Sequence, residues 1–98
     1  MSFISYTINI INNYYYFENG GVKMIKVYTT SSCPWCVKVK NYLKSKNISF
    51  QEVNVGNDIL AREEMLKKSK QMGVPVLDIN GTVIIGFDKP AIDVALTK

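Results

Sequence analysis

The sequence IKVYTTSSCPWCVKVKNYLKSK, residues 25–46, decides the fold that we predict for this chain. Ile25–Thr30 alternates its side chains and is rich in β-branched and aromatic residues, which is typical of a strand. Residues 37–46 repeat apolar side chains at helical spacing, which predicts a helix. Its apolar side consists of Cys36, Val39, Tyr42 and Leu43. The Cys-x-x-Cys motif from Cys33 to Cys36 is therefore expected at a turn from strand to helix.

The chemistry of this motif follows from its place at the start of the helix. With Cys33 as N-cap, Pro34 takes the first helical position, where its missing N–H costs nothing. A thiolate at Cys33 then faces the N–H groups of Trp35 and Cys36 and the positive end of the helix dipole. Such surroundings lower the pKa of a cysteine thiol and make it a nucleophile. Cys36 lies on the same helical face, close enough to form a disulfide. The motif predicts thiol–disulfide exchange.

The cysteine pair has two other conceivable uses. Zinc usually needs four ligands, and this chain has no histidine and no third cysteine. A metal or iron–sulfur binding module would therefore share four cysteines across a dimer, and this stays the alternative function. Pro34 counts against a cluster, because it removes an N–H and stiffens the loop beside the ligand sulfur. A purely structural disulfide would stabilise little, since it closes so short a loop.

Length and composition limit the class of protein. The 98 residues, 47% of them hydrophobic, make one domain with one core. Two cysteines in one motif do not resemble a secreted disulfide framework, and no apolar run approaches the length of a membrane span. We expect a cytoplasmic monomer that binds neither membrane nor nucleic acid, since basic and aromatic residues form no recognisable nucleic-acid module.

The net charge of +4 has a local origin in the first helix. Four lysines and no acid lie there, namely Lys38, Lys40, Lys44 and Lys46. A solvated helix face is the simpler explanation. The alternative is a basic rim near Cys33 that favours the thiolate and steers acidic partners.

Residues 1–23 differ in character from the rest of the chain. Asn, Ile, Tyr and Phe supply fourteen of these twenty-three residues, and only Glu18 and Lys23 are charged. Such residues are typical of A/T-rich DNA, and Gly20-Gly21 can be encoded as the core of a bacterial ribosome-binding site. We therefore expect residues 1–23 to be a mis-assigned leader or a disordered extension, and residues 24–98 to form the domain. A genuine extension with a strand around Tyr14–Phe17 is the alternative.

The remaining elements follow from periodicity and turn residues. Ile48–Val55 alternates and predicts a second strand. Ile59–Met72 predicts a helix that Gly73 ends, with Met65 and Met72 in the core. Asn80-Gly81 predicts a hairpin. Its strands are Val76–Ile79 and Thr82–Ile85. A last helix is predicted to follow, with Asp88 as its cap and Pro90 in its first turn. The side chains of this helix that we expect to face inward are those of Ala91, Ile92, Ala95 and Leu96.

From Met24 the predicted order is β-α-β-α-β-β-α. This order indicates an α/β fold with a mixed four-stranded sheet and three helices on its faces. With Cys-x-x-Cys after the first strand, the arrangement is similar to the thioredoxin fold.

The sequence resembles the glutaredoxin family from Met24 to about Thr97. Cys33-Pro34-Trp35-Cys36 is close to that family's active-site tetrad, and Gly73-Val74-Pro75 is similar to its Thr-Val-Pro. The resemblance implies that Pro75 is cis and faces the cysteines. It also implies that the Val74 backbone pairs with glutathione or with an extended peptide of a protein substrate. Gly86-Phe87-Asp88 takes the place of the family's glutathione-carboxylate site, Gly-Gly-x-x-Asp.

Two departures from the family concern glutathione. Phe87 replaces the second glycine, and Thr30-Ser31-Ser32 lacks the lysine that often precedes the first cysteine. Gly86-Phe87 is similar to the Gly-Phe of small glutaredoxin-like redoxins, which reduce ribonucleotide reductase and accept electrons from thioredoxin reductase. The resemblance therefore implies that a thioredoxin-reductase-type flavoenzyme is the favoured reductant and glutathione the other, with no cofactor bound.

The resemblance and the chemistry together give each residue of the motif a role. Cys33 attacks a disulfide-containing protein substrate or a mixed disulfide, and Cys36 resolves the covalent intermediate. Trp35 either belongs to the docking surface beside the sulfur or only covers the start of the helix. The sequence predicts a dithiol thiol–disulfide oxidoreductase.

Overall fold

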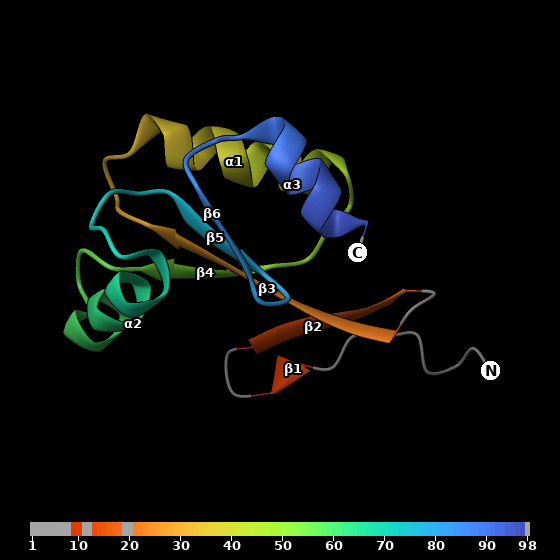
Figure 1. Ribbon diagram of the computed structural model, residues 1–98, viewed down its shortest axis with the longest axis horizontal. Helices are drawn as coiled ribbons and strands as arrows, with labels where there is room; N and C mark the ends of the chain where they lie inside the picture. The colour runs from red at the N-terminus through yellow and green to blue at the C-terminus, as the bar shows by residue number, and fades with distance from the viewer. Residues whose placement is uncertain (1–8, 11–12, 19–20, 98) are drawn as a thin grey trace.

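The computed structural model describes residues 9–10, 13–18 and 21–97, and from Met24 onward its elements follow the predicted order (Figure 1). A long strand, β3, leads into helix α1, and a strand, a helix, a hairpin and a last helix follow. These elements are β3 (Gly21–Thr29), α1 (Pro34–Ser45), β4 (Gln51–Asn54), α2 (Ile59–Ser69), β5 (Val76–Ile79), β6 (Thr82–Ile85) and α3 (Lys89–Leu96).

Strand β3 is the central strand of the sheet. It pairs in parallel with β4, through Lys26–Thr29, and antiparallel with β5, through Ile25–Tyr28. β5 and β6 form the predicted hairpin, in which Asn80 and Gly81 take positive φ angles of 52° and 98°. The order β4-β3-β5-β6 with its three helices confirms the predicted mixed sheet and the thioredoxin fold.

Two further strands, β1 (Asn9–Ile10) and β2 (Asn13–Glu18), extend the described sheet to six strands, with β1 paired to β2 and β2 to β3. β2 pairs with β3 between Gly21 and Met24, before the part of β3 that pairs with β4 and β5. The four-stranded sheet therefore begins at Ile25. Residues 1–8, 11–12 and 19–20 lie outside the described part of the chain, and the leader hypothesis for residues 1–23 stays a prediction.

The alternation of β3 divides the core between the two faces of the sheet. α1 and α3 cover one face and α2 covers the other (Figure 1). Ile25 and Val27 belong to the first cluster and Tyr28 to the second, and all three are fully buried. The first cluster also contains Val39, Leu43, Leu77, Ile79, Ile84, Ile92 and Ala95, and the second Val55, Ala61, Met65 and Val76. Truncating a buried leucine, isoleucine or methionine of these clusters to alanine typically costs about 2–5 kcal/mol, so Leu43 holds α1 firmly on the sheet.

Some predicted boundaries were wrong. β3 begins at Gly21 instead of Ile25, because it continues into the pairing with β2. β4 begins at Gln51, three residues after the predicted start.

Helix α2 ends at Ser69, well before Met72 and Gly73. Lys70 ends it in the left-handed conformation, with φ 62°, and its N–H donates to the Leu66 carbonyl. Met72 is consequently 52% exposed and not part of the core, whereas Met65 is fully buried as predicted.

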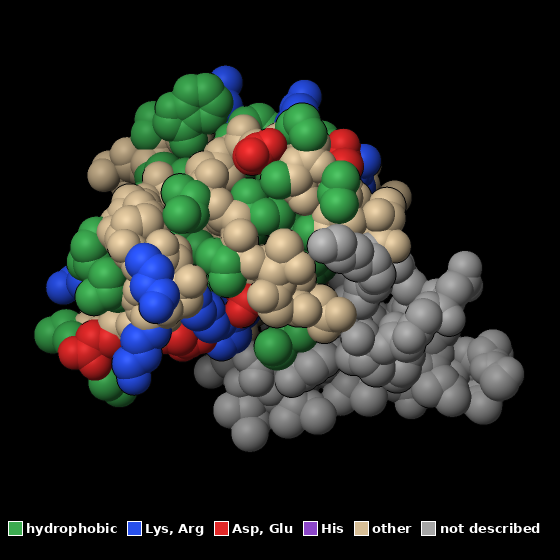
Figure 2. Space-filling view, viewed as in Figure 1, with side chains coloured by type: hydrophobic (Ala, Val, Ile, Leu, Met, Phe, Trp, Pro, Cys, Tyr) green, Lys and Arg blue, Asp and Glu red, His purple; other side chains and the backbone are tan. Residues whose placement is uncertain are grey.

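A polar network ties α2 to the sheet. The Tyr28 hydroxyl and the Lys26 ammonium donate to Glu64 Oε2 at 2.6 and 2.9 Å. Lys68 Nζ donates to the Tyr28 hydroxyl at 2.7 Å and to Asp78 Oδ2 at 2.6 Å. Figure 2 shows charged side chains of both signs gathering over α2. Because strands β3 and β5 both contribute, the network fixes the position of α2 across the sheet.

The network sets the protonation of its members. Burial raises the pKa of Glu64, but hydrogen bonds from the Tyr28 hydroxyl and two ammonium groups outweigh it and lower the pKa to about 2. Burial and the bond to Glu64 raise the pKa of Tyr28 to about 12. Burial alone would lower the pKa of Lys68. Its hydrogen bonds, of which the one to Asp78 has the largest effect, outweigh burial and raise the pKa above the ordinary value. At neutral pH the carboxylate and the ammonium are therefore charged and the phenol is neutral.

Glu64→Gln should reduce the loss of folding stability that the protein shows between pH 7 and pH 2. Because the folded pKa of Glu64 lies below its ordinary 4.5, its contribution is present above about pH 4.5 and is lost as the pH falls through about 2. The Glu64 side chain is 40% exposed, so screening limits this contribution to about 1 kcal/mol. Denaturant unfolding at pH 7 and pH 2 measures it. We expect Glu64→Gln to be less stable at pH 7 and similar to the wild type at pH 2.

The matched control is Glu63→Gln, which removes the neighbouring, exposed carboxylate of the same helix. We expect it to keep the stability and the pH dependence of the wild type. Equal pH dependence in the two variants would contradict the role of the network.

Candidate functional site

The two cysteines lie at the first turn of α1, as predicted. Cys33 is the N-cap, with extended backbone angles (φ −102°, ψ 106°), and Pro34 occupies the first turn. The Cys36 N–H donates to Cys33 Sγ at 3.0 Å, so one unsatisfied donor of the helix start is directed at this sulfur. The two Cα atoms lie 5.2 Å apart, and the sulfurs are joined in a disulfide.

The two sulfurs differ in their access to solvent. Cys33 is partly exposed, whereas Cys36 is 1% exposed and belongs to the buried face of α1. A partner therefore reaches Cys33 and not Cys36. When the pair is reduced, the same N–H is placed to stabilise a thiolate at Cys33, and Cys36 is placed to displace whatever binds to it.

A groove lies beside the cysteine turn. The Val74–Pro75 peptide bond is cis, as the resemblance implied, and the Gly86 N–H donates to the Pro75 carbonyl at 2.9 Å. This bond holds the loop before β5 against the turn after β6. The groove measures about 290 Å³ and is lined by Trp35, Val74, Pro75, Gly86 and Phe87. Trp35 comes from between the two cysteines, so the groove starts at the cysteine turn.

The backbone on one side of this groove favours an extended ligand, and the backbone on the other side positions Phe87. Within residues 21–97, the Val74 N–H and carbonyl make no hydrogen bond to other parts of the chain, so both are available to an added strand. Gly86 has a φ of 82°, in a region that glycine adopts without steric cost. This conformation turns the backbone so that Phe87 follows on the groove side.

Phe87 is the centre of an aromatic cluster that the sequence did not reveal. Its ring centroid lies 6.4 Å from that of Trp35 and 5.6 Å from that of Tyr42, which it meets edge to face. Lys38 Nζ lies 5.3 Å from the Trp35 ring centroid, and Lys89 Nζ lies 5.8 Å from that of Phe87. The sequence did indicate that Tyr42 is on the apolar side of the helix. No local sequence pattern, however, predicts its contact with Phe87.

Not every predicted site residue lines the groove. Asp88 caps α3 by accepting a hydrogen bond from the Ala91 N–H at 3.2 Å, and it lines a separate hollow along β6 and α3. Pro34 is exposed at the start of α1. The structure thus gathers Trp35, Val74, Pro75, Gly86 and Phe87, and leaves Asp88 outside.

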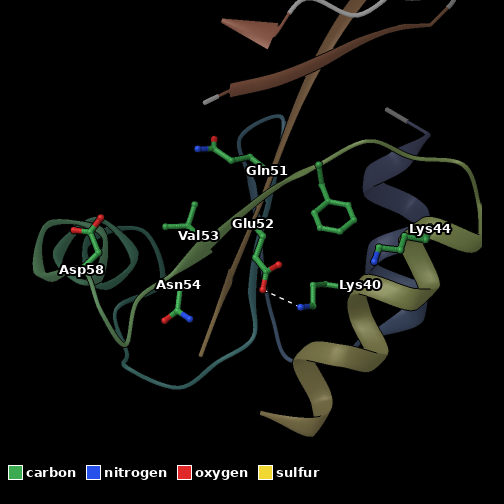
Figure 3. Close-up of a pocket in the computed structure, with 8 residues that line it drawn as sticks. Lys40, Lys44, Gln51, Glu52, Val53, Asn54 and Asp58 are labelled. Atoms are coloured by element: carbon green, nitrogen blue, oxygen red, sulfur yellow. Dashed lines mark hydrogen bonds and ion pairs between the residues drawn. The ribbon is translucent and has the colours of Figure 1, made fainter. Parts of the chain in front are cut away.

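The lysines of α1 do not act as one basic rim. Lys40 pairs with Glu52 of β4 at 2.8 Å, and Lys46 lies 3.8 Å from Asp93 of α3. Figure 3 shows Lys40 and Glu52 pointing toward each other across a second hollow, of about 650 Å³, which α1 and β4 line without either cysteine. Lys38 alone of the four lies over a residue of the groove, Trp35.

The described residues offer neither a metal cluster nor a membrane-spanning helix. No group of three or more His, Cys, Asp or Glu side chains is arranged there to hold a metal ion. Among the helices of residues 21–97, none has the length and apolarity needed to cross a membrane. The shared metal or iron–sulfur site between two chains stays a prediction, for which metal analysis of anaerobically purified protein is the measurement.

A thioredoxin fold with a disulfide at the start of its first helix defines a protein of thiol–disulfide exchange, and comparison with known proteins agrees. The glutaredoxin family model matches residues 25–84. An uncharacterized glutaredoxin-like 8.6 kDa protein from the rubredoxin operon of Clostridium pasteurianum is 57% identical over 75 residues, 76% of this chain and 100% of the relative. Glutaredoxin 3 of Escherichia coli K12 is 39% identical over 64 residues, 65% of this chain and 77% of the relative.

The solved structures agree in fold. A crystal structure of a thioredoxin-like protein superposes with a TM-score of 0.69 at 35% identity, covering 74% of this chain and 97% of that one. The chain belongs to the glutaredoxin family. Its general role is that of a thiol–disulfide oxidoreductase.

Proposed function

We propose that the protein is a dithiol electron carrier that reduces disulfides of protein substrates, with Cys33 as nucleophile and Cys36 as resolving thiol. The observation that carries the proposal is the asymmetry of the pair: Cys33 is accessible and accepts the Cys36 N–H, whereas Cys36 is 1% exposed. A redox pair needs this division, because the first sulfur must meet a partner and the second must react only within the chain.

The proposed cycle balances two electrons. The Cys33 thiolate attacks a substrate disulfide, which breaks the substrate S–S bond and forms a mixed disulfide while one substrate sulfur leaves as thiolate. Cys36 then loses its proton to water and attacks Cys33 Sγ. The mixed disulfide breaks, the second substrate sulfur leaves, and the Cys33–Cys36 disulfide forms. The substrate has gained two electrons, which a reductase must return to the pair.

The groove supports a protein segment as the substrate. The available N–H and carbonyl of Val74 suit an extended backbone, and Trp35 and Phe87, which pack against each other, offer apolar surface beside it. We place the reaction in the cytoplasm, where thiols are kept reduced and disulfides are mostly transient and catalytic.

Cys36→Ser should trap the substrate. The variant forms the mixed disulfide at Cys33 but lacks the thiol that resolves it, so mass spectrometry should find Cys33 joined to a substrate cysteine. Cys33→Ser, the matched control, should trap nothing and should lose disulfide reduction. Trapping through Cys36 in the Cys33→Ser protein, with reduction retained, would reverse the proposed roles.

We further propose that a thioredoxin-reductase-type flavoenzyme returns the electrons more effectively than glutathione. Phe87 stands where the family has a glycine, and its ring packs at 6.4 Å from Trp35. The Asp88 carboxylate already occupies the start of α3 by accepting the Ala91 N–H. Thr30 to Ser32 supply no cation. Each missing charge-assisted contact is worth about 1.5–3 kcal/mol, or roughly ten- to a hundredfold in affinity.

The double variant Phe87→Gly with Thr30→Lys should gain turnover with glutathione, because it restores backbone access and a cation. The measurement is a coupled assay with glutathione and its reductase, run in parallel with a thioredoxin reductase. We expect the wild type to be faster with thioredoxin reductase and the double variant to shift toward glutathione by about tenfold or more. Brisk wild-type turnover with glutathione at physiological concentration, without turnover by thioredoxin reductase, would overturn this assignment.

A further inference from the structure

Phe87 forms one wall of the groove, yet it stands on a turn between β6 and α3. The Gly86 N–H is held by the Pro75 carbonyl at 2.9 Å, which fixes the turn's backbone but not the aromatic ring. The ring is only partly buried, at the edge of the core. A substrate segment meets a formed groove only if other side chains hold this ring in place.

Tyr42 of α1 supplies that support. Its ring meets Phe87 edge to face with centroids 5.6 Å apart. Its hydroxyl donates to Asp93 Oδ1 of α3 at 2.5 Å, across 51 positions of sequence. The hydroxyl is protonated at neutral pH and can donate, and this hydrogen bond raises the pKa of Tyr42 still further. The contact therefore joins α1, which carries the cysteines, to α3, which follows Phe87.

Two lysines lie close to the same rings and to the carboxylate. Lys46 Nζ lies 3.8 Å from Asp93 Oδ1 and 5.1 Å from the Tyr42 ring centroid. Lys89 Nζ lies 5.4 Å from the Tyr42 centroid and 5.8 Å from that of Phe87. Lys89 thus contacts both rings, Lys46 contacts Tyr42, and the Asp93 carboxylate holds the Tyr42 hydroxyl. Figure 1 shows α1 and α3 side by side on the same face of the sheet. The contacts of Tyr42 with Asp93 and Lys89 join these two helices.

We propose that Tyr42 and Asp93 are positioning residues, which hold Phe87 against Trp35 and so fix the groove for the extended segment of a disulfide substrate. The inference rests on the proposed function for the identity of the ligand, but the positioning itself is a property of the free protein. Neither residue contacts a sulfur among the contacts of the described chain, and Tyr42 lies six positions beyond Cys36. Their loss therefore weakens docking and leaves the exchange step intact.

The test uses the full chain, reduced beforehand, in single-turnover reactions that need no reductase. The chain has one tryptophan, Trp35, so its fluorescence reports on this wall alone. Two oxidants are compared: insulin, which offers a protein segment, and bis(2-hydroxyethyl) disulfide, which is too small to use the groove. Trp35 is 57% exposed and its remaining contact includes Phe87, so acrylamide quenching in the free protein measures any further exposure of Trp35 when Phe87 moves away.

The informative variant is Tyr42→Phe, which keeps the ring and removes only the hydroxyl. We expect the half-saturating concentration of insulin to rise about three- to tenfold, with a saturating rate within about twofold of the wild type. Quenching of Trp35 should increase, and the reaction with the small disulfide should not change. Asp93→Ala should change Trp35 quenching and the insulin dependence in the same way as Tyr42→Phe. Asp93→Asn keeps an acceptor oxygen, so both quantities should stay close to those of the wild type.

Tyr28→Phe is the matched control, because it removes another tyrosine hydroxyl that donates to a carboxylate, Glu64, on the opposite face of the sheet. It should lower stability without changing Trp35 quenching or the insulin dependence. Unchanged quenching and insulin dependence in Tyr42→Phe, or equal changes in Tyr28→Phe, would overturn the positioning role. Failure of the wild type to reduce insulin would instead count against the proposed function, and the quenching comparison would still decide the positioning.

Discussion

The hydrogen bond from the Cys36 N–H to Cys33 Sγ is the interaction on which the chemistry of this protein depends. It exists because α1 starts at Pro34, directly after a short turn from the central strand. Val39 and Leu43, both fully buried, hold the helix on the sheet, so the start of the helix cannot turn away from Cys33. The hydrophobic core thus places a helix N-terminus at one sulfur and buries the other.

The two faces of the sheet have different tasks. The face under α1 and α3 carries the cysteines, the groove and the aromatic cluster around Phe87. The face under α2 carries the network of Glu64, Lys68 and Tyr28, whose charges and hydrogen bonds tie α2 to β3 and β5. Because β3 alternates its side chains, one strand serves both faces, and substitutions on one face can be compared with matched substitutions on the other.

Local patterns predicted most of the fold and the centre of the site. The Cys33-Pro34 start of α1, the Asn80-Gly81 hairpin and the buried Met65 follow from spacing and turn chemistry. The early end of α2 was missed because Lys70, an ordinary helix former, takes a left-handed conformation there. The contact of Tyr42 with Asp93 was missed for another reason. It joins residues 51 positions apart, and only the packing of α1 beside α3 brings them together.

The rate of alkylation of each cysteine tests the central claim most directly. Reduced protein is treated briefly with iodoacetamide at pH 7, and the modified peptides are quantified by mass spectrometry. Because Cys33 accepts the helix N–H and is accessible, whereas Cys36 is buried, we expect Cys33 to react at least about tenfold faster. Equal rates, or faster alkylation of Cys36, would contradict the account.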